Sequence, residues 1–215
     1  MRILSLRAGP AILAALLLAL LPVTAPLAAQ DRGAQPVPKV APSGRVTTSV
    51  TFDGRVLRDG GWFTYTPSHS GPSRITIDYG QPHARGRKIF GGLVPYGEVW
   101  RLGANWATRL TLDFDVRFGG LDVPRGEYTL FMLPRENGGE LIVSRQTRQW
   151  GTDYDPSFDF GRTPIERRPL EATVRSLAVT LAPDLPTEEG AVPSGMLRIT
   201  WGEAEYFTPW RMLWP

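Results

Sequence analysis

The chain has 215 residues, with 24 basic and 21 acidic side chains, two histidines and no cysteine. This length is sufficient to bury a core, and the lack of cysteine excludes a disulfide framework. The near balance of charge, without a concentrated basic face, argues against a nucleic-acid partner.

Residues 1–29 have the composition of a secretory signal peptide. Arg2 and Arg7 precede a short apolar run, and small residues then offer a cleavage site after Ala29 or Ala28. We therefore expect an exported protein, periplasmic or extracellular, with no stable membrane insertion after cleavage. The alternative is that the segment is retained as an anchor. Removing Arg2 and Arg7 leaves 24 − 2 = 22 basic residues against 21 acidic ones, so the exported chain is close to neutral.

Residues 30–44 are rich in proline, glycine and alanine and lack any apolar period. Such a composition predicts a flexible linker. The remaining residues, 45–215, are few enough for one domain.

In this domain the apolar residues recur with a period of two, which is typical of β-strands with one buried face. The segment 128–133 is apolar on both faces and predicts a central strand. The full set of predicted strands is 75–79, 110–116, 128–133, 141–144, 174–181 and 197–201.

Short segments that contain glycine separate several of these strands and predict tight hairpin turns. They are Gly119-Gly120, Asn137-Gly138-Gly139 and Gly202-Glu203. Residues 146–172 and 182–195 are predicted loops, and the tail 207–215 either forms a last strand or covers one end of the sheets. The sequence therefore predicts an all-β fold, an antiparallel β-sandwich with a barrel-like alternative, with long ordered loops and little helix.

Residues 78–105 combine glycines, prolines, basic residues and aromatics without any helix or strand period. A segment of this length without secondary structure is either disordered or functional. Its aromatic residues can be buried, which favours an ordered loop that displays polar groups.

Several motifs in and after this loop resemble those of DUF2911, a family of exported bacterial proteins of unknown function. They are Tyr79-Gly80-x-Pro82, Arg85-Gly86-Arg87-Lys88-Ile89-Phe90-Gly91, Val94-Pro95-Tyr96-Gly97-x-Val99-Trp100-Arg101-x-Gly103-Ala104-Asn105, Phe118-Gly119-Gly120, Pro124-x-Gly126-x-Tyr128, Leu130-Phe131 and Trp150-Gly151. The resemblance covers about residues 73–201. It implies no activity, because the family has no settled one. One departure is Arg85, where family members often carry lysine.

The loop offers candidates for ligand contacts. Arginine side chains on a glycine-rich loop suit carboxylates, phosphates or sugar hydroxyls, but they equally pin loops to carboxylates of the same protein. The aromatics, together with Trp106 and Trp150, could form a platform for sugars or simply fill the core. Asn105 could present its amide or adopt a left-handed backbone. The predicted ligand-binding residues are Arg85, Arg87, Lys88, Tyr96, Trp100, Arg101 and Asn105.

Glu98 and His83 are the candidates for acid–base catalysis. His69 and His83 lie far apart and no metal-binding motif is present, so we predict no metal site and no cofactor. The favoured hypothesis is a non-enzymatic module that binds a polar, anionic or carbohydrate ligand at the 80–105 loop. The alternatives are a hydrolase that uses Glu98 or His83, and a purely structural module of the envelope.

Overall fold

The computed structural model describes residues 43–52, 54–56, 62–64, 73–184 and 191–213. All of them belong to one compact unit, Val40–Pro215. The predicted signal peptide, the predicted linker up to residue 42 and His69 lie outside the described residues.

The described residues form antiparallel strands and, as their only helical element, one short 3-10 turn, η1 (Pro156–Phe158). The strands are β1 (Arg45–Phe52), β2 (Gly54–Val56), β3 (Trp62–Thr64), β4 (Ser73–Gly80), β5 (Thr108–Leu112), β6 (Val116–Phe118), β7 (Leu121–Val123), β8 (Gly126–Arg135), β9 (Gly138–Ser144), β10 (Asp159–Pro183) and β11 (Ser194–Met212). Nine of them form one open sheet in the order β1-β4-β5-β8-β9-β10-β11-β6-β7, and β2 pairs with β3. The predicted all-β fold class is confirmed.

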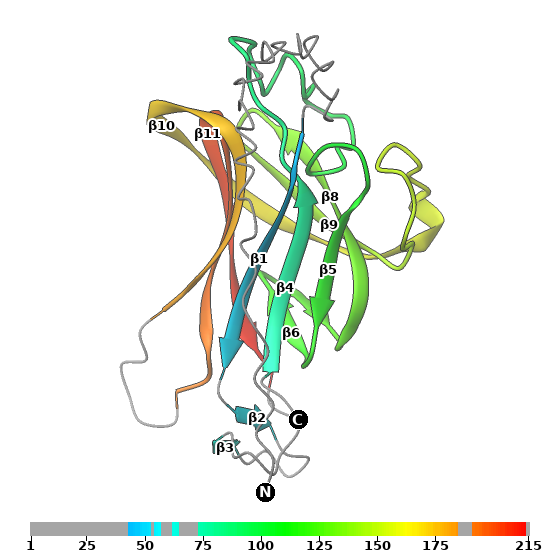
Figure 1. Ribbon diagram of the computed structural model, residues 1–215, viewed down its shortest axis with the longest axis vertical. Helices are drawn as coiled ribbons and strands as arrows, with labels where there is room; N and C mark the ends of the chain where they lie inside the picture. Colours follow the sequence, from blue (N-terminus) through cyan, green and yellow to red (C-terminus); the bar gives the residue numbers. More distant parts are fainter. Residues whose placement is uncertain (1–42, 53, 57–61, 65–72, 185–190, 214–215) are drawn as a thin grey trace, which may run out of the picture. The chain divides into compact units, whose positions relative to one another are not determined.

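The sheet folds over on itself because β10 takes part in both layers. Its first part, from Asp159 to Ile165, pairs with β9, and its second part pairs with β11. Register shifts between Pro169 and Ala178 mark the bend between these two parts, as expected for β-bulges. Figure 1 shows β10 and β11 standing opposite β1 and β4.

The inner faces of the two layers share one core. On β4 the alternation buries Ile75, Ile77 and Tyr79, and on β11 it buries the large rings of Trp201 and Trp210. The layers are also linked by hydrogen bonds to β10. The Tyr79 hydroxyl accepts from the Val179 N–H at 3.1 Å, and the Thr48 hydroxyl donates to the Val179 carbonyl at 2.8 Å. The predicted strands 75–79 and 128–133 lie within β4 and β8 and are confirmed.

Three local predictions were wrong. The predicted strand 110–116 is interrupted at residues 113–115. Here the chain passes from β5 to β6, and these two strands are not neighbours in the sheet. The predicted loop 146–172 is extended from Asp159 onward as part of β10. Gly202 is not in a hairpin: β11 continues through it, and its φ of 62° gives an irregularity within the strand.

Residues 81–107, which we call the strap, connect β4 to β5 without regular structure. Ile89, Phe90 and Val94 of the strap are buried in the core. The Trp100 backbone exchanges two hydrogen bonds with Met132 of β8, at 2.7 and 2.9 Å. The Ala104 N–H donates to the Gly80 carbonyl at 3.0 Å. The strap is thus fixed by apolar burial at its middle and by backbone bonds at its end.

The anchor at Gly80 leaves no room for a side chain. A Cβ atom there would collide with the Ala104 carbonyl oxygen, whereas a Cβ at Gly120 would meet nothing within 4 Å. We expect Gly80→Ala to lower the free energy of unfolding by about 2 kcal/mol, because the strap must shift. The measurement is urea denaturation, with Gly120→Ala as the control, expected within about 0.5 kcal/mol of wild type. Equal stability of the two variants would contradict this anchor.

Candidate functional site

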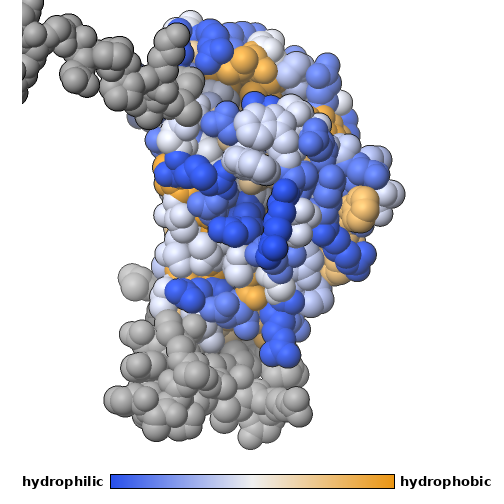
Figure 2. Space-filling view, turned by 45° about the vertical axis from the view of Figure 1, so that its right-hand side comes forward, coloured by the Kyte–Doolittle hydropathy of each residue, from blue (hydrophilic) through white to orange (hydrophobic). Residues whose placement is uncertain are grey.

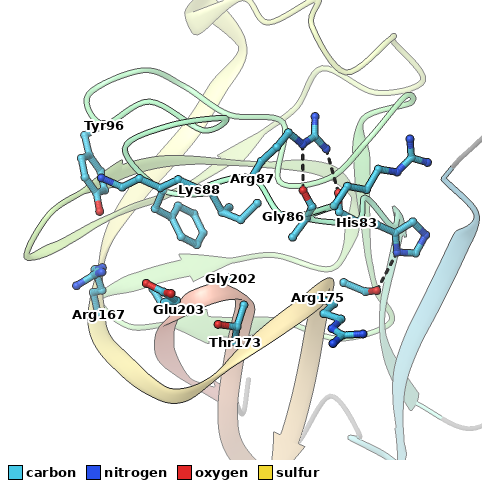
Figure 3. Close-up of a pocket in the computed structure, with 16 residues that line it drawn as sticks. His83, Gly86, Arg87, Lys88, Tyr96, Arg167, Thr173, Arg175, Gly202 and Glu203 are labelled. Atoms are coloured by element: carbon cyan, nitrogen blue, oxygen red, sulfur yellow. Dashed lines mark hydrogen bonds between the residues drawn. The ribbon is translucent and has the colours of Figure 1, made fainter.

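A cavity of about 1080 Å³ lies between the strap and the bend of β10 and β11. We call it the strap cavity. Its wall on the strap side is made by residues 83–90 and Tyr96, and its other wall by residues of β10 and β11 around Arg175 and Gly202. Figure 3 shows Tyr96 and Arg167 at one end of this space and His83 and Arg175 at the other.

Backbone contacts hold the strap against β10 at the His83 end. The Ala84 N–H donates to the Arg175 carbonyl at 2.7 Å, and the Leu177 N–H donates to the Pro82 carbonyl at 3.0 Å. The strap therefore begins as an extra short strand beside β10, next to the irregular part of that strand. This pairing places the side chains of residues 83–88 along one edge of the cavity.

A glycine on β11 lets the middle of the strap approach the bend. A Cβ atom at Gly202 would lie 2.9 Å from Ile89 Cγ1, closer than carbon atoms normally approach. Phe90 packs next to Ile89 with its ring centroid 4.8 Å from that of Tyr206. Close packing here seals the core below the cavity and leaves the polar ends of the strap residues above it.

Cationic side chains dominate the cavity. Five of them, Arg85, Arg87, Lys88, Arg167 and Arg175, line it, together with a single carboxylate, Glu203. Within the described ranges, none of these five forms an ion pair. Several uncompensated positive charges around one concave surface produce an electrostatic potential that attracts anions.

Two of these arginines are partly engaged with their surroundings. Arg87 donates from Nε to the Ala84 carbonyl and from Nη2 to the His83 carbonyl, both at 3.0 Å, as the dashed lines in Figure 3 show. Arg167 lies over the Tyr206 ring at 5.9 Å, and its buried Nε has no hydrogen-bond partner among the described residues. Burial raises the pKa of Tyr206 to about 12, so this phenol stays neutral and does not offset the positive charge.

His83 and Ser176 form a polar pair at the edge of the cavity. Nδ1 of His83 lies 2.8 Å from the Ser176 hydroxyl oxygen. Both residues line the cavity and both are partly exposed. Within the part of the chain that the structure describes, the other ring nitrogen of His83 has no hydrogen bond to a carboxylate. The pair therefore lacks the third group that orients the histidine in a catalytic triad.

The structure divides the residues that the sequence singled out. His83, Arg85, Arg87, Lys88 and Tyr96 line the strap cavity. The remaining candidates, Glu98, Trp100, Arg101 and Asn105, are not part of its lining.

Each residue outside the lining has a different setting. Trp100 stacks on Trp201, with ring centroids 5.8 Å apart, and so belongs to the core packing. Asn105 has a φ of 63°, and its carbonyl accepts a hydrogen bond from the Gly151 N–H. Glu98 is exposed on the strap. Arg101 forms no ion pair in the described chain, and its buried Nε has no hydrogen-bond partner there.

Sequence reasoning missed the contribution of β10 and β11. Arg167, Thr173, Arg175 and Ser176 line the cavity from β10, in or just after the segment that the sequence predicts as a loop. The basic residues in the second half of the predicted loop could have indicated this contribution, but only the fold places them opposite the strap. In the described ranges, no helix is long and apolar enough to span a membrane, and no three side chains of the metal-ligating types come together.

A family model described as a protein of unknown function, DUF2911, matches residues 46–208. The chain belongs to the DUF2911 family. The match is wider than the span 73–201 that carries the sequence motifs, and it includes every residue that lines the strap cavity. Comparisons with curated proteins and with solved structures gave no match.

In this DUF2911 chain, Arg87 contributes positive charge to the cavity and also stabilises the strap through its two hydrogen bonds. We expect Arg87→Met to lower the free energy of unfolding by about 1 kcal/mol, because two carbonyls of the strap lose a charged donor. Arg85→Met is the matched control, since the exposed Arg85 side chain has no hydrogen bond or ion pair among the described residues. Chemical denaturation of both variants is the measurement, and equal stability would show that Arg87 does not hold the strap.

Proposed function

We propose that the protein binds a multivalent anion, a molecule with two or more carboxylate or phosphate groups, in the strap cavity. The observation that supports this most strongly is the group of five cationic side chains, without ion pairs in the described chain, that line the cavity together with a single carboxylate. Guanidinium groups bind carboxylates and phosphates through pairs of parallel hydrogen bonds. A single small anion would leave most of these charges unused, so several anionic groups on one ligand suit the cavity better.

The unpartnered Nε of Arg167 supports the same conclusion. A buried donor without an acceptor costs free energy, and a ligand oxygen would supply the missing acceptor when the Arg167 side chain turns its Nε toward the cavity. Gly86 is exposed on the strap wall, which allows a ligand to approach the backbone closely there. The cavity and its unpaired charges weigh against a purely structural module, for which we would expect paired arginines and no cavity.

We further propose that binding takes place outside the cytoplasm, on the basis of the predicted signal peptide at residues 1–29. A cavity that relies on charge is sensitive to the salt of its surroundings, because mobile ions screen exposed charges. Binding should therefore weaken as ionic strength rises.

Calorimetric titration of the exported chain with pyrophosphate and with tricarballylate tests the proposal. We expect saturable binding of at least one of them and none of acetate at the same ionic strength. Arg175→Gln should weaken binding about tenfold, the effect of losing one charged hydrogen-bonding partner. Arg125→Gln, which removes an exposed arginine outside the cavity lining, should bind as wild type. Absence of saturable binding, or an equal loss in both variants, would contradict the proposal.

A hydrolase is the second candidate, and the His83–Ser176 pair is the observation that favours it. In such a reaction the Ser176 oxygen would add to the carbonyl carbon of an ester while its proton passes to Nδ1 of His83. The departing alcohol would then take that proton, and water would cleave the acyl-serine to regenerate the hydroxyl and release the acid. The lack of an orienting carboxylate in the described chain makes binding without turnover the better-supported function.

Release of 4-nitrophenol from 4-nitrophenyl succinate separates these two functions. The binding account expects no release above the rate in buffer. Release that Ser176→Ala abolishes and Thr173→Ala retains would establish the hydrolase, because Thr173 is a second hydroxyl residue of the same cavity lining.

A further inference from the structure

A second cavity, of about 390 Å³, lies on the outer face of the sheet and is independent of the strap cavity. Its lining comes from β1, β4, β5 and β8, from residues 106–107 just before β5, and from residues 147–149 after β9. We call it the outer cavity. Figure 2 brings the β5 side of the molecule forward and shows a mostly hydrophilic surface with small, separate hydrophobic spots.

Strand register sets the floor of the outer cavity. Asp78 pairs with Arg109, and Arg109 pairs with Thr129, so the three side chains form a row on one face of the sheet. Rigid strands therefore hold a carboxylate, a guanidinium group and a hydroxyl side by side. Such a row offers both donors and acceptors at fixed spacing.

The positive charge of this cavity is largely offset by carboxylates, in contrast to the strap cavity. Arg45 forms an ion pair with Asp78, and Arg109 lies 4.0 Å from the same carboxylate. Arg148 lies 3.6 Å from Glu127. Every arginine that lines the outer cavity thus has a carboxylate beside it. A ligand here needs no net charge of its own.

The Asp78 carboxylate remains ionised at neutral pH. Partial burial raises the pKa of Asp78, but hydrogen bonds from Arg45 and Thr47 outweigh this effect, and the pKa lies below its ordinary value. Asp78 therefore acts only as a hydrogen-bond acceptor, while the guanidinium groups act only as donors.

Two exposed tryptophans stand beside this polar floor. Trp106, which lines the cavity, is 51% exposed, and Trp150 is 43% exposed. Their rings meet edge to face with centroids 5.5 Å apart. The backbone holds them in place, because the Ala107 N–H donates to the Gln149 carbonyl and the Gly151 N–H donates to the Asn105 carbonyl. Tryptophan is enriched at binding surfaces, where one edge of the ring is buried and the other is exposed to water.

Gln149 supplies an unused polar atom at the same place. Its Nε2 donates to the Thr129 hydroxyl at 3.4 Å, but its Oε1 is buried and has no hydrogen-bond partner in the described ranges. A buried acceptor without a donor costs free energy, and a donor from outside the protein reaches it when the Gln149 amide turns toward the cavity that it lines. A hydroxyl group of a ligand can provide it.

We propose that the outer cavity is a carbohydrate-binding site, which takes one unit of a neutral saccharide. A pyranose ring has an apolar face of C–H groups and a rim of hydroxyls. The Trp106 ring covers the apolar face, while Asp78, Arg109 and Gln149 bind the hydroxyls as acceptors and donors. Because each arginine of the lining has a carboxylate beside it, the site does not need an anionic sugar. This distinguishes it from the strap cavity.

Titration of the exported chain with neutral tetrasaccharides tests the site. The probes are cellotetraose, maltotetraose, xylotetraose and chitotetraose, each followed by tryptophan fluorescence and by calorimetry up to about 10 mM. At least one should bind saturably. Trp106→Ala should weaken that binding about tenfold or more, as expected for a central aromatic contact.

Phe158→Ala is the matched control, because Phe158 is an exposed aromatic, 47% exposed, outside the cavity lining. It should bind as wild type, and so should Arg175→Gln, which alters only the strap cavity. Gln149→Met provides a second test of the site and should weaken binding at least about fivefold. The proposal is overturned if no tetrasaccharide binds, if Trp106→Ala binds as wild type, or if Phe158→Ala loses as much. It is also overturned if the Trp106 surface instead mediates self-association in size-exclusion chromatography.

Discussion

Burial of the strap against the bend of β10 and β11 is the constraint on which the rest of the structure depends. Ile89 fits against the bare backbone of Gly202, and Phe90 packs on Tyr206 beside it. Without these contacts the segment between β4 and β5 would have only its backbone bonds to hold it. With them, a loop that has no regular structure becomes one wall of a cavity.

The same constraint explains why charged side chains can gather there. The apolar residues of the strap are buried in the core, while Arg85, Arg87 and Lys88 line the cavity from the strap, and β10 adds Arg167 and Arg175 from the other wall. Mutual repulsion of these groups opposes folding, and the buried apolar surface of the strap compensates for it. On the outer face of the sheet, by contrast, each cavity-lining arginine has a carboxylate beside it. The two cavities therefore suit ligands of different charge.

The sequence predicted the strands in which buried and exposed residues alternate regularly. Ile75, Ile77 and Tyr79 alternate with polar residues in the sequence, and they are the buried residues of β4. The part of β10 before residue 173 was missed because Pro164 and Pro169 lie within it, and proline normally argues against a strand. The break at residues 113–115 was missed because the apolar alternation runs through it without interruption, although the chain changes partners there.

The candidate site was only half predictable for a related reason. Arg85, Arg87 and Lys88 are close together in the chain, so a pattern reveals them. Arg167 and Arg175 come close to these residues only because β10 bends, and no sequence pattern predicts this bend. Trp100, which the motif suggests as a ligand contact, lies outside the cavity lining, where it is partly buried and stacks on Trp201.

Amide hydrogen exchange resolved by residue is the most direct measurement of the central claim, that the strap is a fixed wall. The N–H groups of Val94, Trp100 and Ala104 are bonded to the carbonyls of Ile89, Met132 and Gly80. They should exchange as slowly as those of β8, with no ligand present, because opening them requires the buried strap to leave the core. Exchange at the rate of an unstructured chain would contradict the account, since a strap that opens freely cannot hold a cavity in shape.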